Sequence, residues 1–267
     1  MRVLFWNTHK NQNINTFLTT IIVENSISIV VLAEYADDVN CLKKSLANHG
    51  VNMNNFSSPF CERIVILSSE KNVIAGRQTK YASIQIINNE DILCCVHLPS
   101  QLLSDHQKRR NIAISRIVND IINTENEFNT NNTIVVGDFN ENPYNEGCLS
   151  AERFHGIPVS KETEREKRVV SGEEFKMFYN PMWNFFGDFN YPPGTYYYAG
   201  GNSEMPYWNI FDQVLMRPAM RHRFIDSSLK IITSTETKSL IDEKGYPCSE
   251  ISDHLPIVCE IKENNHE

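Results

Sequence analysis

The order of apolar and polar positions along the chain predicts a series of buried strands and amphipathic helices. An unbroken apolar run, "ISIVVLAEY" at 27–35, indicates a central strand that is buried on both faces. The stretches "RVLFWN" at 2–7 and "TIVVGDFN" at 133–140 have the same character. Apolar residues recur at helical spacing in three further segments, at 14–24, at 35–50 and from Ser104, which has capping-box spacing to Gln107, through Ile122.

Six shorter apolar stretches complete the set of expected strands: "ERIVILSS", "YASIQIINN", "DILCCVHL", "NIFDQVLM", "LKIITS" and "LPIVCEI". The first three follow one another closely, which favours a mostly antiparallel meander. Because each of the two groups of strands has its own helix pattern, we expect an α+β protein of two packed sheets with helices outside. No repeat or Gly/Ser linker divides the 267 residues, so the expectation is a single domain over 1–267.

The tetrapeptide Gly-Asp-Phe-Asn occurs twice, at 137–140 and at 187–190. In the first copy Asp138 and Asn140 follow a β-favouring run and project to the same side of a strand end, where they form a rigid pair of oxygen-bearing groups. The second copy lies in an irregular, aromatic-rich insertion at about 150–198, directly before two prolines, which are incompatible with a central strand. The context therefore assigns the chemistry to the first copy.

Other polar side chains also follow apolar strands abruptly. Each has an ordinary explanation of its own, such as a turn, a helix cap or a hydrogen-bonded core histidine. Taken together they provide the carboxylates, amides and imidazoles that a hard cation and a phosphoryl group require. The residues are Asn7, Glu34, His97, Asp212, Asp253 and His254.

Composition restricts the function classes. The formal net charge of −8 argues against nucleic-acid binding by bulk electrostatics, although it is compatible with an enzyme that recruits a divalent cation. The seven cysteines are odd in number and have no C-x-x-C spacing, so neither a zinc site nor a disulfide framework is expected. No apolar run reaches the ~18 residues of a membrane helix. A cytoplasmic protein without an obligate protein partner is the expectation.

The chain resembles the endonuclease/exonuclease/phosphatase superfamily, whose fold is shared by pancreatic-type deoxyribonuclease. The resemblance covers residues 5 to 257 and follows the family order of motifs: "FWNTH", "VLAEY", "CVHLPSQ", "VVGDFNENP", "NIFDQVL" and "SDHLPIV". It implies a four-layer α-β-β-α sandwich with the site between the edges of the two sheets. Two departures are notable: Ala33 precedes Glu34 where the family usually has glutamine, and His9 stands where abasic-site endonucleases have aspartate.

The resemblance also implies roles for the polar residues. Glu34 is the expected ligand of Mg²⁺ or Mn²⁺, with Asn7 and Asp253 in or near the shell. Asp212 and His254 are expected to form a carboxylate-imidazole pair. Either Asp138 or His254 is the general base. His97, Asn7 and Asn140 are expected to hold the phosphate.

The substrate is the least determined part of the prediction. The leading hypothesis is a nuclease or other phosphodiesterase that acts on DNA or RNA; the alternatives are hydrolysis of a small or lipid phosphoester and a non-catalytic binding protein on the same scaffold. The aromatic run at 178–198 either stacks on bases or packs on itself. Basic side chains form either a phosphate-binding patch or an ordinary solvated surface. They are Lys108, Arg109, Arg110, Arg116, Arg217, Arg221 and Arg223.

Overall fold

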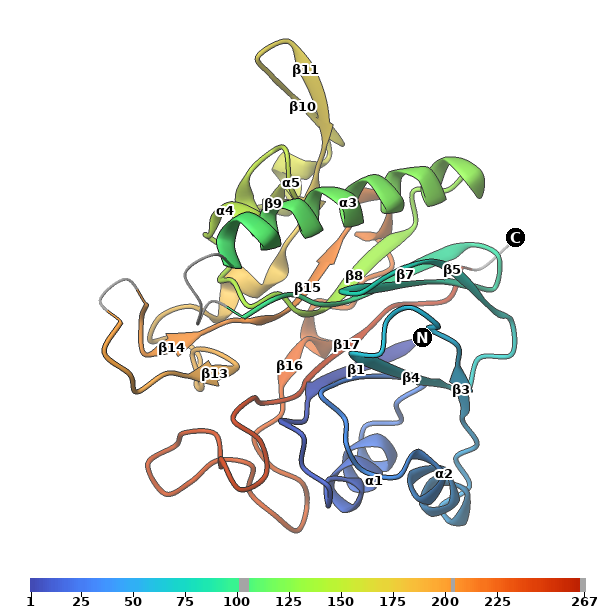
Figure 1. The fold of residues 1–267 in the computed structure, drawn as a ribbon, viewed down its shortest axis with the longest axis vertical. Helices are drawn as coiled ribbons and strands as arrows, with labels where there is room; N and C mark the ends of the chain where they lie inside the picture. The colour runs from blue at the N-terminus through green and yellow to red at the C-terminus, as the bar shows by residue number, and fades with distance from the viewer. Residues whose placement is uncertain (101–105, 203–204, 265–267) are drawn as a thin grey trace.

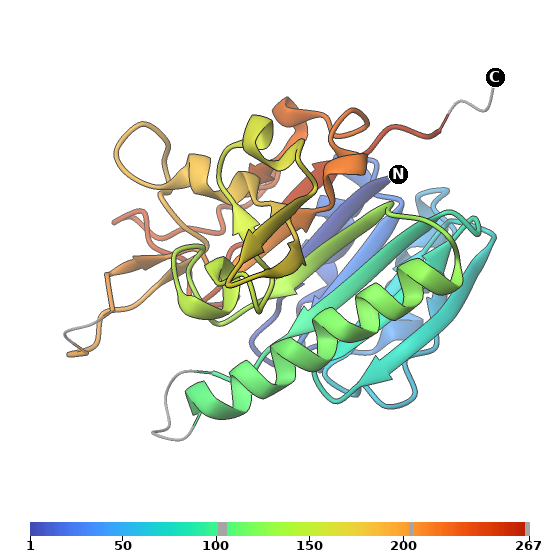
Figure 2. The same cartoon turned by 90° about the horizontal axis from the view of Figure 1, so that it is seen from above.

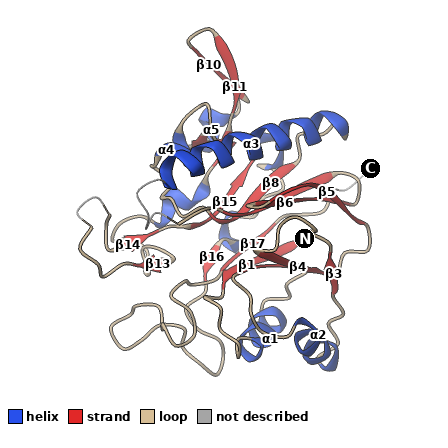
Figure 3. Ribbon diagram, in the orientation of Figure 1, coloured by secondary structure: helices blue, strands red, loops and turns tan. Residues whose placement is uncertain are grey.

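A computed structural model describes residues 1–100, 106–202 and 205–264, so Ser104 lies outside the described residues. Two large sheets face each other, and helices cover their outer faces (Figures 1 and 3). This is the expected α+β architecture of four layers in the order α-β-β-α. None of the helices within the described ranges is long and apolar enough to cross a membrane.

The first sheet has six strands and contains the N-terminal strand near its middle. Its order is β16 (Lys230–Ile231), β17 (Ile257–Glu260), β1 (Arg2–Asn7), β2 (Ile29–Ala33), β4 (Ile64–Ser68) and β3 (Asn54–Phe56). Only the β1–β2 pair is parallel among these neighbours. The outer face of this sheet is covered by α1 (Asn15–Glu24) and α2 (Val39–Asn48).

The second sheet has seven strands. Its order is β5 (Val73–Thr79), β6 (Ala82–Ile87), β7 (Asp91–His97), β8 (Thr133–Asp138), β15 (Asp212–Met216), β12 (Phe178–Tyr179) and β9 (Gly156–Ile157). The pairs β7–β8 and β12–β9 are parallel and the others are antiparallel. The long helix α3 (His106–Glu127) lies across its outer face (Figure 2).

Alternate residues of the central strands pack into different layers, which explains why these strands are apolar without interruption. Phe5 and Val31 belong to the core between the sheets, whereas Leu4 and Val30 pack against α1 and α2. In β7, Cys95 faces the inter-sheet core and its neighbour Cys94 faces α3. A strand buried on both faces needs apolar side chains at every position.

Between β8 and β15 the chain forms several short elements in addition to β9 and β12, which belong to the second sheet. The charged stretch at 160–176, within the insertion expected to be irregular, contains both α5 (Ser160–Thr163) and a hairpin that projects from the body of the protein (Figure 1). Several short elements complete the fold: α4 (Glu146–Leu149), β10 (Lys167–Val170), β11 (Glu173–Lys176), η1 (Pro181–Phe185), β13 (Tyr196–Tyr197), β14 (Trp208–Asn209), η2 (Pro218–Met220) and η3 (Asp226–Ser228).

Candidate active site

Strand pairing brings polar residues from distant parts of the chain to one edge of the sandwich. Asp138 at the end of β8 is paired in register with His97 at the end of β7 and with Asp212 at the start of β15. On the facing sheet, Asn7 at the end of β1 is paired with Ala33, the residue before Glu34. The two sheets meet here directly, because the Asn7 amide donates a 3.0 Å hydrogen bond to Asp138.

Asp138 is the most enclosed carboxylate of the site. Its Oδ2 accepts hydrogen bonds from the amides of Asn7 and Asn140, at 3.0 and 3.1 Å, and its Oδ1 accepts one from the Asn140 backbone N–H at 2.8 Å. Burial raises the pKa of Asp138 to about 7, although the positive charge of His254 and these hydrogen bonds act in the opposite direction. The carboxyl group is therefore poised to exchange a proton near neutral pH.

His254 and Asp212 form a buried carboxylate-imidazole pair. His254 Nδ1 lies 2.8 Å from Asp212 Oδ2. Burial lowers the pKa of the imidazole, but the charges of Asp212, Asp138 and Asp253 outweigh burial and raise the pKa to about 10. His254 is consequently an imidazolium at neutral pH. The ring of Tyr196 packs against it with centroids 4.8 Å apart and fixes its orientation.

Asp138, Asp212 and His254 converge: one ligand-type atom from each lies within 4.8 Å of the others. Metal binding is not the only use of such a group. Because Asp212 Oδ2 already contacts His254, this cluster has the arrangement of an acid-base group held by a carboxylate. Asp212 Oδ1 has no hydrogen-bond partner within the described residues.

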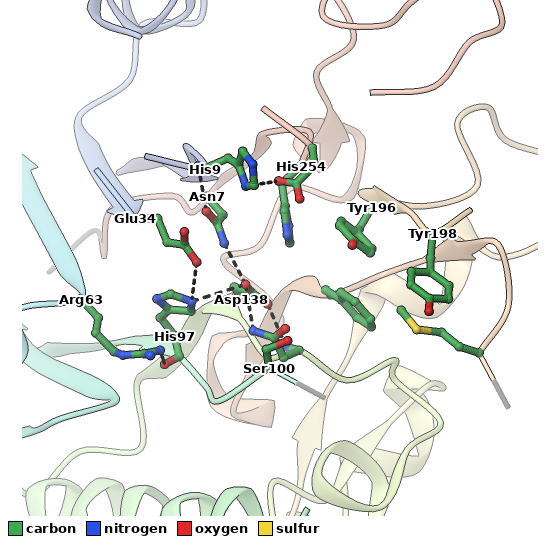
Figure 4. Close-up of a pocket in the computed structure, with 14 residues that line it drawn as sticks. Asn7, His9, Glu34, Arg63, His97, Ser100, Asp138, Tyr196, Tyr198 and His254 are labelled. Atoms are coloured by element: carbon green, nitrogen blue, oxygen red, sulfur yellow. Dashed lines mark hydrogen bonds and ion pairs between the residues drawn. The ribbon is translucent and has the colours of Figure 1, made fainter. Parts of the chain in front are cut away.

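Glu34 and His97 lie next to each other on the side of the pocket that contains Arg63 (Figure 4). Glu34 Oε1 lies 3.6 Å from His97 Nε2, and Asp138 Oδ2 lies 3.8 Å from the same nitrogen. Burial and the positive charges of Arg63 and His254 lower the pKa of His97 to about 3. His97 is therefore neutral at pH 7. Its Nε2 is beyond hydrogen-bond distance of Glu34, whose carboxylate accepts no hydrogen bond from the described residues.

Asp253 has a different neighbour. Its Oδ1 lies 3.1 Å from His9 Nδ1, and its carboxylate is partly exposed beside the pocket. Asp253 lines the pocket together with Glu34 and Asn7, but the cluster of Asp138, Asp212 and His254 includes neither Glu34 nor Asp253.

The backbone is strained at the pocket. His9, Glu34 and Asn140 have φ values of 47°, 49° and 49°, in the left-handed region that non-glycine residues seldom occupy. All three residues lie within two positions of the end of a central strand. Strain of this kind is concentrated at functional sites, where packing fixes a conformation that places a side chain.

These residues line a cavity of about 280 Å³. It also contains side chains to which sequence analysis gave no role. Some of them, such as Tyr196 and Tyr198, belong to the aromatic run, whereas Arg63 precedes β4 and reaches the pocket only because β4 pairs with β2. The added residues are Arg63, Ser100, Tyr196, Tyr198, Met205 and Phe211.

The two Gly-Asp-Phe-Asn copies differ completely in environment. In the first, Asp138 is 1% exposed and hydrogen-bonded within the site. In the second, all four residues at 187–190 are exposed, and Phe189 is 99% exposed. Asn190 donates a hydrogen bond to the backbone oxygen of Asn184, which stabilises a surface loop between β12 and β13.

The basic residues considered as a phosphate patch are only partly surface residues. Arg110 is buried and paired with Glu141, Arg217 is buried and paired with Glu125, and Arg223 forms a two-fold contact with Asp91. Both sequence interpretations were wrong for these three arginines, because their charges neutralise buried carboxylates. Lys108, Arg109 and Arg116 are exposed on α3.

The rings of the aromatic run pack mainly on rings from outside it, so the expectation that the run packs on itself is wrong. Tyr197 stacks on Tyr246 with centroids 3.8 Å apart and also contacts Trp208, which has Tyr191 as a further neighbour. Tyr196 stacks on Phe211 and faces the pocket.

No model of a known protein family matches the sequence, and no curated protein matches it. Solved structures match over nearly the whole chain. An AP endonuclease from Archaeoglobus fulgidus superposes with a TM-score of 0.58 at 12% identity, over 98% of this chain and 100% of the other. This is the endonuclease/exonuclease/phosphatase fold. The 3'-5' exonuclease NExo from Neisseria meningitidis has a TM-score of 0.56 at 16% identity, over 98% and 100% of the two chains. D. rerio TDP2 complexed with a single-strand DNA product has a TM-score of 0.51 at 15% identity, over 98% and 99%.

The endonuclease/exonuclease/phosphatase fold explains why the six sequence motifs converge. They lie far apart in the chain, yet each includes or directly follows the end of a strand at the shared edge of the two sheets. The expected fold is confirmed. The roles of the individual side chains stay predictions.

Proposed function

We propose that this protein is a divalent-metal-dependent phosphodiesterase that hydrolyses P–O bonds, with nucleic acid as its substrate class. The observation that carries the proposal is the convergence of Asp138, Asp212 and His254 within 4.8 Å at a pocket that Glu34 enters from the facing sheet. A proton-accepting carboxylate, a protonated imidazole and an acceptor-only carboxylate are what phosphoester hydrolysis requires.

The residues fit a Mg²⁺ or Mn²⁺ ion. The Glu34 carboxylate is 28% exposed toward the pocket, and its nearest cation, Lys10 Nζ, is 4.0 Å away. An oxygen donor that lacks a close partner within the described residues suits a hard cation. Glu34 would hold the ion, with Asn7 Oδ1 and Asp253 as further oxygen donors. When bound, the ion supplies positive charge that neutralises a phosphoryl oxygen.

The surrounding side chains position the substrate and move the proton. Asp138 accepts a proton from the attacking water, because its pKa of about 7 leaves a useful fraction ionised at neutral pH. His254, held by Asp212 through Nδ1, presents its other ring nitrogen as a charged donor to a phosphoryl oxygen. The raised pKa of His254 favours this assignment over the alternative in which the imidazole is the base.

His97 and Asn140 complete the proposed phosphate site. Neutral His97 presents Nε2 to the pocket and donates to a phosphoryl oxygen in the tautomer that protonates this atom. The Asn140 amide donates to Asp138 Oδ2 and to the backbone oxygen of Leu98, which holds the loop after β8 in place. His97 thus binds phosphate without adding a fixed charge, whereas both N–H groups of the Asn140 amide are engaged, so Asn140 acts by holding Asp138 and the loop in place.

Support for nucleic acid as the substrate comes from the structural neighbours, since NExo is an exonuclease and TDP2 was solved with a DNA product. The net charge of −8 instead favours a small phosphoester. Salt dependence separates the two: cleavage of a polyanion weakens steeply as salt rises, whereas cleavage of a small ester changes little. The cytoplasmic location stays a prediction.

A substrate panel tests the proposal. Plasmid, linear and single-stranded DNA, RNA, 5′-tyrosyl DNA, a phosphoinositide and sphingomyelin are incubated with Mg²⁺, Mn²⁺ or a chelator. We expect hydrolysis of a nucleic acid with either metal and its loss in chelator and in the Asp138→Asn variant. Absence of turnover on every substrate with both metals would contradict the enzyme proposal. Cleavage of the lipids alone would support metal-dependent phosphoester hydrolysis but would contradict nucleic acid as the substrate class.

A further inference from the structure

A second cavity adjoins the candidate active site and contains cations that the proposed chemistry does not use. It has a volume of about 290 Å³ and shares Glu34, Arg63 and His97 with the first cavity. Lys10 also lines it. Tyr196 and Tyr198 lie on the opposite side of the candidate active site, so the cleft has one aromatic side and one cationic side (Figure 4).

Arg63 is held at the junction of the two cavities. Its guanidinium carbon lies 5.2 Å from the centroid of the Tyr81 ring, and its NH1 lies 3.5 Å from the backbone oxygen of His97. This leaves most of its five N–H donors without a partner among the described residues. Lys80 Nζ lies 5.6 Å from the same Tyr81 ring. In a chain with a net charge of −8, two cations thus line the second cavity, and Lys80 lies near the ring that holds one of them.

The cations are not cancelled by strong ion pairs. Lys10 Nζ lies 4.0 Å from Glu34, which is the limit of an ion pair, and Glu34 is the residue that would hold the metal ion. The other carboxylate of the second cavity, Glu62, is exposed. A planar guanidinium fixed by stacking and open on its remaining donors is the arrangement with which proteins bind phosphate.

We infer that Arg63, assisted by Lys10 and Lys80, binds a second phosphate group of the substrate, one linkage away from the phosphoryl group that undergoes hydrolysis. This inference rests on the proposed function and narrows it. The substrate class becomes phosphoesters that have a neighbouring phosphate, either the next linkage of a nucleic-acid strand or a terminal phosphate. An isolated monophosphodiester lacks the group that Arg63 contacts.

Short thymidine oligonucleotides test the inference by pairing a protein change with a substrate change. The wild-type protein, Arg63→Ala and Arg63→Lys are assayed on an oligonucleotide with native linkages and on one whose neighbouring linkage is an uncharged methylphosphonate. Arg168→Ala, an exposed arginine on the projecting hairpin, is the matched control. Comparing kcat/KM on pTpT and on TpT shows whether a terminal phosphate can be the second phosphate that Arg63 contacts.

For wild type we expect the methylphosphonate to lower kcat/KM by about 10- to 100-fold, as is typical for loss of a charge-assisted hydrogen bond, mainly through KM. Arg63→Ala should show that loss on the native oligonucleotide and no further loss on the methylphosphonate. Its loss of activity on bis(p-nitrophenyl) phosphate, which has no second phosphate, should be much smaller than its loss on the native oligonucleotide, and Arg168→Ala should behave as wild type throughout. Arg63→Lys, which keeps the charge, should lie between wild type and Arg63→Ala.

Equal losses of activity on both oligonucleotides and on the small ester would overturn the inference, because Arg63 would then act on the chemistry through His97. Unchanged kinetics in Arg63→Ala would overturn it as well. Fluorescence anisotropy of a labelled oligonucleotide in chelator gives a readout that needs no turnover. If wild type hydrolyses nothing, the proposed function fails, and equal binding by wild type and Arg63→Ala would then also reject the phosphate subsite.

Discussion

His254 Nδ1 is 2.8 Å from Asp212 Oδ2, and both side chains are almost completely buried at the base of the pocket. We predict that Asp212→Asn lowers the pKa of His254, because the charge that offsets burial is removed. The imidazole then loses its proton near neutral pH, and phosphoester turnover falls by at least ~10²-fold, within the range for one acid-base group. NMR titration of the His254 ring, together with kcat, measures both effects. An unchanged His254 titration would contradict the assignment.

The duplicated tetrapeptide provides a matched pair of substitutions. Asp138→Asn changes the buried copy, and Asp188→Asn makes the same change in the exposed copy. We expect the first to lower turnover by ~10²–10⁴-fold and the second to leave it unchanged. Steady-state kinetics on the best substrate of the panel measures both. Equal effects of the two substitutions would show that position at a strand end does not determine function.

The pH dependence of activity follows from two raised pKa values. Asp138 must be ionised to accept a proton, so activity should rise as the pH passes through about 7. His254 must be protonated to donate, so activity should fall as the pH approaches about 10. The profile of kcat/KM is thus expected to be bell-shaped. In His254→Gln the alkaline limb should disappear along with most of the activity. A profile that falls through pH 7 would assign the opposite proton roles.

Stability should depend on pH through the same residues. The pKa of Asp138 is about 7 in the folded protein and near 3.9 in an unfolded chain, so folding favours the protonated form. Its stabilising contribution is fully present below about pH 4 and is lost as the pH rises to about 7. Asp138→Asn should therefore flatten the fall in the free energy of unfolding across this window. Urea unfolding at a series of pH values measures the change, and parallel curves for both proteins would contradict it.

The sequence predicts the elements whose side chains are buried. It misses exposed strands that are held mainly by backbone hydrogen bonds to a neighbouring strand. The central strands β1, β2 and β8 each have an unbroken apolar run because both faces are covered, and the polar residues that follow these runs mark the pocket. The hairpin of β10 and β11 is exposed along nearly all of its length, so no apolar alternation marks it. The edge strand β5 is interrupted by Gly76 and is mostly outside the core.

The positions of single charged side chains were harder to predict. Arg63 lies at the pocket because β4 pairs with β2, and that register depends on contacts between distant residues. Arg110 was expected on a surface because its neighbours Lys108 and Arg109 are charged. Its burial depends on a partner 31 positions away, Glu141, which is not apparent from local spacing.

Metal binding can be tested without turnover. Glu34→Gln keeps the size of the side chain and removes the charge that would hold the ion. We expect the affinity for Mg²⁺ or Mn²⁺, measured by isothermal titration, to fall by at least about 10-fold. The thermal stabilisation that either metal gives to wild type should decrease in parallel. Asp188→Asn is the control with the same loss of charge at an exposed site. If Glu34→Gln and wild type bound the metal with equal affinity, Glu34 would not be a ligand of the ion.

Arg217 distinguishes a structural cation from a phosphate-binding one. Its Nε donates to Glu125 at 2.7 Å, both side chains are buried, and Lys176 is the other cation that contacts this carboxylate. Arg217→Ala leaves Glu125 buried with Lys176 and the Thr133 hydroxyl and should lower the free energy of unfolding by about 3–5 kcal/mol. Arg221→Ala breaks a partly exposed pair with Asp226 and should cost no more than about 1 kcal/mol. Urea unfolding measures both values.

Neither Arg217→Ala nor Arg221→Ala should change the salt dependence of oligonucleotide binding. The measurement is made at a temperature at which both variants are folded. A cation that contacts phosphate contributes about one unit to the slope of log affinity against log salt concentration. If Arg217→Ala reduced the slope by that amount and left the free energy of unfolding unchanged, Arg217 would be a substrate-binding residue rather than a structural one. Because its guanidinium is also stacked 3.8 Å from the centroid of Phe178, away from solvent, we expect the loss to appear only in stability.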